Sequence, residues 1–246
     1  MMKRPKVKYT IAALLVFVLC AMLIFLAQKA EPMEEAYSAY AKDDNMLIIE
    51  DDDFITFQPK INDTNIGLII YPGAKVDPKA YAPTAKAIAE QGIRTIIVKM
   101  PLNLAIMGAN KADQVIERDA GIEKWYIAGH SLGGVMAARY TKNHLDVING
   151  LILWAAYPEK SVDLSKATIP IMSIYGTNDG LTLPGDISDT QHLLPDTVQW
   201  VSISGGNHSQ FGWYGFQKGD NQADISREEQ QKEIVEATIE LIKTGN

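Results

Sequence analysis

Short apolar runs alternate with amphipathic stretches from about residue 46 to the end of the chain. The apolar runs are continuous, which is typical of strands that are buried on both faces of a parallel sheet. Strands that alternate with helices predict an α/β fold whose mostly parallel sheet has helices on both faces. The strands are expected at 53–58, 66–71, 94–99, 125–129, 150–154, 169–175 and 198–203, and the helices at 78–91, 113–120, 132–144 and 226–243.

Several helix boundaries carry their own signals. Asp77 directly precedes Pro78, and this order predicts an N-cap followed by proline at the first helical position. Gly92 is expected to end the same helix. Ser226 and Glu229 have the spacing of a capping box, which places the start of the last helix there.

The N-terminal segment has a different pattern. Residues 9–27 are apolar and would extend about 28 Å as a helix, enough to cross a bilayer core. Because basic residues stay in the cytoplasm, the sequence predicts a cytoplasmic segment at 1–8, a transmembrane anchor at 9–27, a polar stalk at 28–45 and a globular domain at 46–246. The chain would then be a single-pass protein of the cell membrane with its domain on the extracytoplasmic side. The basic residues that precede the apolar run are Lys3, Arg4, Lys6 and Lys8.

Two alternatives remain for this segment. A cleaved signal peptide would make the domain a secreted protein, but no small-residue cleavage site follows the apolar run. Lipid modification of Cys20 is the other alternative, although Leu19 stands where a small residue is expected.

Composition and charge exclude several classes of function. The 246 residues suffice for one sizeable domain, and the net charge of −7, without a basic block in that domain, argues against nucleic-acid binding. Cys20 is the only cysteine, so the chain can form neither an internal disulfide nor a cysteine metal site. The four histidines are scattered and no H-E-x-x-H motif is present. We therefore expect no metal and no cofactor.

The segment Gly-His-Ser-Leu-Gly at residues 129–133 is the main candidate for chemistry. It lies between a strand-like run and a helix-like run, which is the context that a G-x-S-x-G nucleophile elbow requires. A sharp strand-to-helix turn would expose the hydroxyl of Ser131 above the edge of the sheet. The sequence therefore predicts that Ser131 is a nucleophile, against the alternative of an ordinary glycine-rich turn.

A serine nucleophile needs a base and an acid that orients the base. His208 is the expected base because it lies in a glycine-rich loop that follows a strand, whereas His144 is expected to end a helix and His192 to be exposed. Asp179 is the expected acid because it comes directly after the strand at 169–175. The other acids after Ser131 lie in linkers, on a helix or at the opposite edge of the sheet, namely Asp163, Asp186, Asp189 and Asp196.

An oxyanion hole would complete this arrangement. Its donors are expected to be backbone N–H groups, one from Leu132 at the start of the helix and one from the turn after the strand at 66–71. Ala74 is the expected second donor, with Gly73 and Lys75 as alternatives in the same turn.

These motifs together carry a family resemblance. The segments are YPGAKVDPKAYAP, VKMPLNLAI, GHSLGGVMAARY, LWAAYP, SIYGTNDG, GGNHSQFGWYGFQKGD and ISREEQQ, from about residue 66 to 231. They resemble the α/β-hydrolase superfamily, and within it a bacterial branch of small, lidless hydrolases similar to dienelactone hydrolases. The resemblance implies Ser131, Asp179 and His208 as the catalytic triad. Dienelactone hydrolases proper use a cysteine nucleophile, a departure that bears on the substrate and not on the fold.

The sequence predicts the general class of substrate, but neither its acyl group nor its leaving group. Residues 154–169 form a short connection between two strands, so no large cap domain is expected over the site. Trp154, Phe211 and Trp213 are the expected substrate contacts, although loop aromatics can equally pack onto the domain. We expect a membrane-anchored serine hydrolase that cleaves a small-molecule or lipid carboxylic ester through an acyl-enzyme. The alternatives are acyl transfer to a lipid or cell-wall hydroxyl, and a non-catalytic binding module on a hydrolase scaffold.

Overall fold

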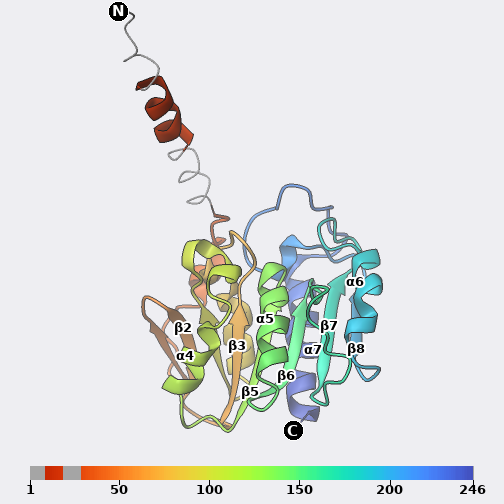
Figure 1. Ribbon diagram of the computed structural model, residues 1–246. Helices are drawn as coiled ribbons and strands as arrows, with labels where there is room; N and C mark the ends of the chain where they lie inside the picture. Colours follow the sequence, from red (N-terminus) through yellow and green to blue (C-terminus); the bar gives the residue numbers. More distant parts are fainter. Residues whose placement is uncertain (1–8, 19–28, 246) are drawn as a thin grey trace, which may run out of the picture.

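A computed structural model describes residues 9–18 and 29–245 of the chain. Within this part, eight strands form one sheet in the order β1-β2-β4-β3-β5-β6-β7-β8 (Figure 1). The pairs β1–β2 and β2–β4 are antiparallel and the other pairs are parallel, which confirms the expected mostly parallel sheet. The strands are β1 (Met46–Glu50), β2 (Phe54–Pro59), β3 (Ile66–Tyr71), β4 (Ile93–Val98), β5 (Lys124–His130), β6 (Ile148–Trp154), β7 (Ile171–Gly176) and β8 (Gln199–Ile203).

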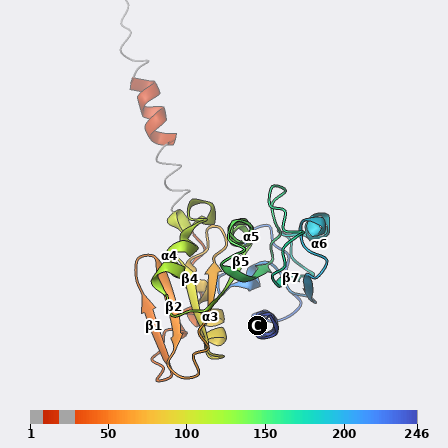
Figure 2. The same cartoon turned by 60° about the horizontal axis from the view of Figure 1, so that its bottom comes forward.

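Helices cover both faces of the sheet. Helix α5 packs on one face and α3 and α7 on the other, as Figure 2 shows. The α-helices are α2 (Glu34–Ser38), α3 (Ala82–Ala89), α4 (Lys111–Arg118), α5 (Leu132–Asn143), α6 (Pro184–Thr190) and α7 (Arg227–Thr244). Single 3₁₀ turns are η1 (Pro78–Tyr81), η2 (Pro101–Asn103), η3 (Ala105–Met107), η4 (Gln191–Leu193) and η5 (Ser209–Phe211).

The hydrophobic core has two halves, one on each face of the sheet. Because successive side chains of a strand point to opposite faces, Leu68 and Ile70 of β3 join the cluster under α3 and α7, whereas Ile69 and Tyr71 join the cluster under α5. All six residues of β3 are buried. This double burial is the physical reason why the strand reads as a continuous apolar run.

The boundary signals act as the sequence predicts. The Asp77 carboxylate accepts a hydrogen bond from the N–H of Lys79 at the start of η1, which continues into α3. Gly92 has a φ of 87°, a left-handed conformation that suits glycine. Ser226 and Glu229 form a complete capping box at the start of α7. The expected helix over residues 78–91 is therefore a 3₁₀ turn followed by a shorter α-helix.

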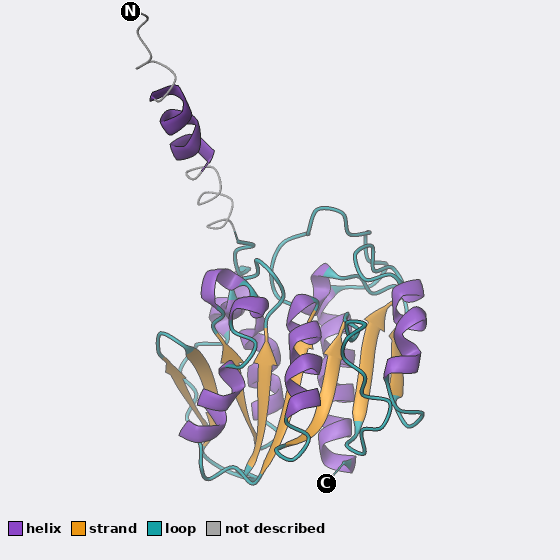
Figure 3. Cartoon of the chain, viewed as in Figure 1, coloured by secondary structure: helices purple, strands orange, loops and turns teal. Residues whose placement is uncertain are grey.

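No cap domain follows the helix after Ser131. The connection between β6 and β7, residues 155–170, consists of turns and bends without a helix or strand. The loops at the carboxyl ends of the parallel strands instead come from several connections, and Figure 3 shows them gathered on one edge of the sheet. Ligands of open α/β sheets bind at this edge.

The prediction of a transmembrane helix must be corrected. The structure describes a helix over residues 9–18, the part of the predicted anchor that lies within the described residues. No helix among the described residues combines the length and the apolar character needed to cross a membrane. The predicted anchor at 9–27, and with it the single-pass location at the cell membrane, was therefore wrong. Residues 19–27 of that prediction lie outside the described residues.

The segment expected as a polar stalk packs against the domain. Ala30 forms a parallel bridge with Val76, and Pro32 forms an antiparallel bridge with Tyr214. In α2, Ala36 is fully buried. We call residues 29–33 the N-terminal strap, because they join the turn after β3 to the loop after β8.

Candidate active site

Ser131 lies on a sharp turn between β5 and α5. Its backbone has φ 53° and ψ −124°, a conformation that residues other than glycine rarely adopt. The Ser131 N–H donates to the Trp154 carbonyl at 3.0 Å, and its own carbonyl accepts from Gly134 and Val135 in the first turn of α5. Neighbouring elements thus hold the residue in a strained conformation, as is common at catalytic positions.

Two glycines allow this turn to form. A Cβ atom at Gly129 would lie 2.4 Å from the Gly133 carbonyl oxygen, and one at Gly133 would lie 2.1 Å from the Tyr71 carbonyl oxygen. Both distances are shorter than any real contact of a Cβ atom. The first turn of α5 therefore packs directly on the backbone of β5 and on the end of β3.

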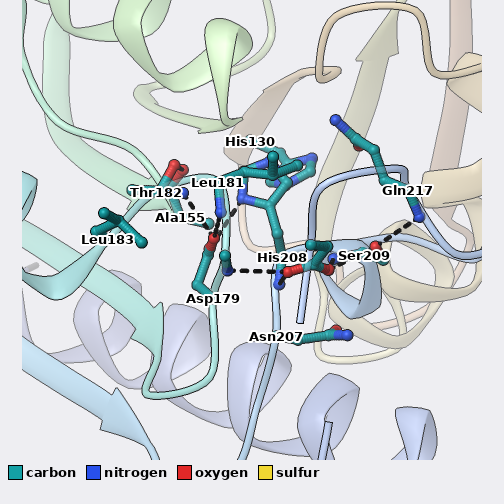
Figure 4. A network of polar contacts seen from close by, with 12 residues as sticks. His130, Ala155, Asp179, Leu181, Thr182, Leu183, Asn207, His208, Ser209 and Gln217 are labelled. Carbon is teal, nitrogen blue, oxygen red and sulfur yellow. Dashed lines mark hydrogen bonds and ion pairs between the residues drawn. The ribbon is translucent and has the colours of Figure 1, made fainter. Parts of the chain in front are cut away.

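Asp179 and His208 are in direct contact. The Asp179 Oδ2 atom lies 2.8 Å from His208 Nδ1, and both side chains are almost fully buried. The other carboxylate oxygen accepts hydrogen bonds from the N–H groups of Leu181 at 2.8 Å and Thr182 at 2.6 Å. Figure 4 shows the carboxylate between these amides and the His208 ring. Asp179 follows β7 and His208 follows β8, so adjacent parallel strands bring the two residues together.

Asp220 holds the loop that carries His208, and sequence reasoning missed this residue. We call residues 204–220 the histidine loop. One Asp220 oxygen accepts from the N–H groups of His208 at 3.3 Å and Gly180 at 3.0 Å, and the other accepts from the N–H and hydroxyl of Ser209. A single buried carboxylate therefore ties the histidine loop to the loop that carries Asp179. The signal in the sequence was weak, because Asp220 follows a glycine like many turn aspartates.

Side chains of helix α7 form hydrogen bonds with the backbone of the histidine loop. Gln230, fully buried, accepts from the Asn207 N–H at 2.9 Å and donates to the Asn207 carbonyl at 2.7 Å. The Arg227 guanidinium donates to the carbonyls of Ser209 and Gly212. These bonds restrain the backbone on both sides of His208.

His130 and Tyr81 form a second polar pair next to His208. The Tyr81 hydroxyl lies 2.8 Å from His130 Nδ1 and accepts from the Gly73 N–H at 2.9 Å. The His130 ring centroid lies 4.5 Å from that of His208, and the ring stacks on Phe211. Burial, and after it the neighbouring His208, lowers the pKa of His130 well below its ordinary value. Burial likewise raises the pKa of Tyr81. Both side chains are therefore neutral, and the Tyr81 hydroxyl donates to His130 Nδ1.

The turn after β3 has one amide that stays open. We call residues 72–75 the β3 turn. Its Gly73 N–H donates to Tyr81, and its Lys75 N–H donates to the Asn103 carbonyl at 2.8 Å. Within residues 9–18 and 29–245, neither the Ala74 N–H nor the Leu132 N–H at the start of α5 has an acceptor. Of the three amides considered from the sequence, Ala74 is thus the one free to bind an oxyanion.

The predicted triad residues are brought to one edge of the sheet. Asp179 touches His208, and Ser131 directly follows His130, whose ring packs on His208. In the described part of the chain, the Ser131 hydroxyl forms no hydrogen bond with another residue. Such bonds are often loose before a substrate is bound. His144 and His192 lie elsewhere, at the end of α5 and in η4.

The three aromatic residues expected to contact the substrate pack in three different places. Trp154 is fully buried in the core, and its indole N–H donates to Thr238 of α7 at 3.2 Å. Phe211 is also fully buried, against His130. Trp213 lies at a groove between α3 and α7. All three side chains are buried, whereas Phe216 of the histidine loop is exposed.

A metal centre is not formed by the described residues, because no three of their histidine, cysteine, aspartate or glutamate side chains are grouped to hold an ion.

Comparisons with known proteins define the class. The model of the alpha/beta hydrolase family matches residues 67–232, more than half of the chain. The chain therefore belongs to the alpha/beta hydrolase family, which confirms the superfamily expected from the sequence. A comparison with curated proteins gives no match.

Solved structures share the fold at low sequence identity. A CIB-like hydrolase from Thermoplasma acidophilum has a TM-score of 0.60 and 15% identity, over 81% of this chain and 97% of its own. Est1E from Butyrivibrio proteoclasticus has a TM-score of 0.59 and 16% identity, over 81% of this chain and 100% of its own. Carboxylesterase CesB from Bacillus subtilis has a TM-score of 0.53 and 11% identity, over 71% of this chain and 88% of its own.

Proposed function

We propose that this hydrolase cleaves carboxylic esters through an acyl-enzyme on Ser131. The observation that carries the proposal is the buried contact of 2.8 Å between Asp179 and His208, beside a serine in a strained turn. Asp179 would fix the His208 tautomer with the proton on Nδ1, and this leaves Nε2 as a base. The carboxylesterase named among the structural neighbours supports an ester as substrate.

The reaction proceeds in two balanced halves. His208 Nε2 accepts the Ser131 proton while the serine oxygen bonds to the ester carbonyl carbon, and the tetrahedral oxyanion accepts hydrogen bonds from the N–H groups of Leu132 and Ala74. His208 then gives the proton to the leaving alcohol, and the acyl group stays on Ser131. Water then gives a proton to the same Nε2 and bonds to the acyl carbon, and His208 returns this proton to the Ser131 oxygen as the bond to Ser131 breaks and the carboxylic acid leaves.

A neutral His130 is part of this proposal. Its ring lies next to His208 and carries no charge, so it does not oppose the positive charge that His208 gains in the transition state. Tyr81 and His130 together also restrain Gly73, and hence the direction of the Ala74 N–H.

The experiment that tests the function compares the full chain with its Ser131→Ala variant. We expect a fluorophosphonate probe to label the wild type and not the variant, and hydrolysis of 4-nitrophenyl acetate to fall by about 10⁴-fold or more. Ser202→Ala, which removes an exposed hydroxyl on β8, is the matched control and should leave both unchanged. Equal labelling of wild type and Ser131→Ala would overturn the proposal.

A further inference from the structure

A cavity of about 390 Å³ lies beside the β3 turn. Three segments that are far apart in the sequence form its walls, namely residues 29–30, 74–76 and 216–218. One lining residue is Ala74, whose N–H is a proposed oxyanion donor. A group bound in this cavity would therefore belong to the same molecule as the ester that is being cleaved, or compete with it.

The lining of the cavity is basic in an acidic protein. Three lysines line it and no aspartate or glutamate does, although the chain as a whole has a net charge of −7. Lys218 is exposed and forms no ion pair with any residue of the described ranges. The lining lysines are Lys29, Lys75 and Lys218.

Two acidic residues that do not line the cavity offset part of the positive charge of its lysines. Asp77 bonds the Lys29 ammonium, and Glu31 lies 3.7 Å from it. The bond to Asp77 raises the pKa of Lys29, so this lysine stays protonated. Asp77 is itself buried and fixed as the cap of η1. It therefore positions Lys29 at the cavity, whose other two lining lysines are Lys75 and Lys218.

The N-terminal strap builds one wall. The Ala30 N–H donates to the Lys75 carbonyl at 2.6 Å, and the Asp77 N–H donates to the Ala30 carbonyl at 3.1 Å. Lys75 has a φ of 61°, in the left-handed region. Such conformations persist where the surroundings impose them, and here bonds on both sides of the residue do so. Hydrogen bonds thus hold the backbone of Lys75 in a strained conformation, directly after the proposed oxyanion donor Ala74.

An aromatic side chain forms the opposite wall. Phe216 of the histidine loop is 54% exposed and lines the cavity together with Lys218. Binding sites for small molecules combine apolar surface with a few placed polar groups. Ammonium groups beside an aromatic ring suit a ligand that has an apolar body and a negatively charged group.

We propose that this cavity binds a carboxylate or phosphate carried by the ester substrate, on either its acyl or its alcohol part. The inference rests on the proposed function of Ser131, and it narrows the substrate class from esters in general to anionic esters. It also gives the N-terminal strap a role, because the strap supplies Lys29 and holds Lys75.

Matched pairs of substrates test the inference on the full chain. The mono-4-nitrophenyl ester of glutarate is compared with 4-nitrophenyl valerate for a charge on the acyl side. For a charge on the alcohol side, 4-acetoxybenzoate and 4-acetoxyphenyl phosphate are compared with methyl 4-acetoxybenzoate. We expect the anionic member to have the higher kcat/KM in at least one pair, with an advantage that shrinks as salt is added.

Charge variants of Lys218 locate the effect. Lys218→Gln should lower the ratio of anionic to neutral kcat/KM by about threefold and Lys218→Glu by about tenfold. Lys232→Glu, an exposed lysine on α7, is the matched control and should leave the ratio unchanged. Equal ratios in wild type and Lys218→Glu would overturn the inference.

Failure of the two proposals can be told apart. If neutral esters are cleaved in a Ser131-dependent way but Lys218→Glu leaves the ratio unchanged, only the anion site is wrong. If no ester is cleaved, the proposed function fails, and binding of 4-methylbenzoate to the full chain is measured by calorimetry. Saturable binding that Lys218→Glu weakens would support the cavity as an anion site, and no binding would overturn it.

Discussion

The two sides of the candidate site are held by different kinds of contact. On one side, the carboxylates of Asp179 and Asp220 accept hydrogen bonds from backbone amides and from His208. On the other side, the β3 turn is held by Tyr81 and His130, which are both neutral. Negative charge thus faces His208, which becomes positive in the proposed mechanism, whereas the Gly73 N–H of the β3 turn donates to a neutral hydroxyl. In the proposed mechanism, this difference would let one site stabilise a positive charge on His208 and a negative charge on the substrate.

Asp179→Asn tests the charged side and should have the largest effect. The amide group would favour the wrong tautomer of His208, so we expect kcat for 4-nitrophenyl acetate to fall by about 10⁴-fold. The fold should survive, because the Asn oxygen can still accept from Leu181 and Thr182. Thermal unfolding serves as the control. A folded variant with more than a tenth of the wild-type kcat would show that the charge of Asp179 is not required.

Tyr81→Phe tests the neutral side. It leaves the buried Gly73 N–H without an acceptor, which should cost about 1–3 kcal/mol of unfolding free energy. We also expect kcat to fall by about 10–100-fold with little change in KM, because the turn bearing the Ala74 N–H is less restrained.

Tyr71→Phe is the matched control for this variant. The Tyr71 hydroxyl is also buried, but it donates to the Ala109 carbonyl and accepts from the Ala112 N–H, away from the β3 turn. It should lose stability and keep its kcat. A similar loss of kcat in both variants would show that Tyr81 acts on stability alone.

The smallest predicted effect concerns pH and His130. The pKa of His130 is lowered well below its ordinary value in the folded state. Below about pH 6.5 the unfolded chain therefore binds a proton that the folded chain does not, and stability falls as the pH falls. Between pH 7 and pH 5.5 this contribution is about 1 kcal/mol of unfolding free energy.

Urea unfolding of wild type and His130→Gln at the two pH values measures this difference. We expect the variant to lose about 1 kcal/mol less than the wild type on acidification. Other groups face His130, notably His208, Tyr81 and Tyr214, and they are common to both proteins. Identical acid sensitivity would mean that His130 does not resist protonation.

Much of the fold could be predicted because burial leaves a direct mark on the sequence. β3 is buried at every position and has the bounds that its apolar run predicted. β1 was not predicted as a strand, because it lies at the edge of the sheet and both Leu47 and Ile49 are substantially exposed. The apolar run at 9–27 led to a wrong prediction, since no helix among the described residues is long and apolar enough to cross a membrane.

The residues of the candidate site also divide into those that could be predicted from the sequence and those that could not. Ser131, Asp179 and His208 could be proposed because their side chains carry recognisable chemistry at expected positions along the strands. Asp220 and Tyr81 could not, because their importance comes from backbone amides that tertiary folding places beside them. The roles of the triad residues and of Leu132 and Ala74 remain predictions that the variants above test.

The N-terminal strap also sets a time at which the site can be complete. Ala30 bonds to residues 75 and 77, and the Met33 N–H donates to the Trp213 carbonyl at 2.8 Å. Protein synthesis makes the strap well before Trp213, and contacts between such distant residues form slowly in folding. A nascent chain on the ribosome therefore lacks both the histidine loop and one attachment of the strap until residues 204–220 have been made. The assembled site therefore requires a chain that extends past the histidine loop.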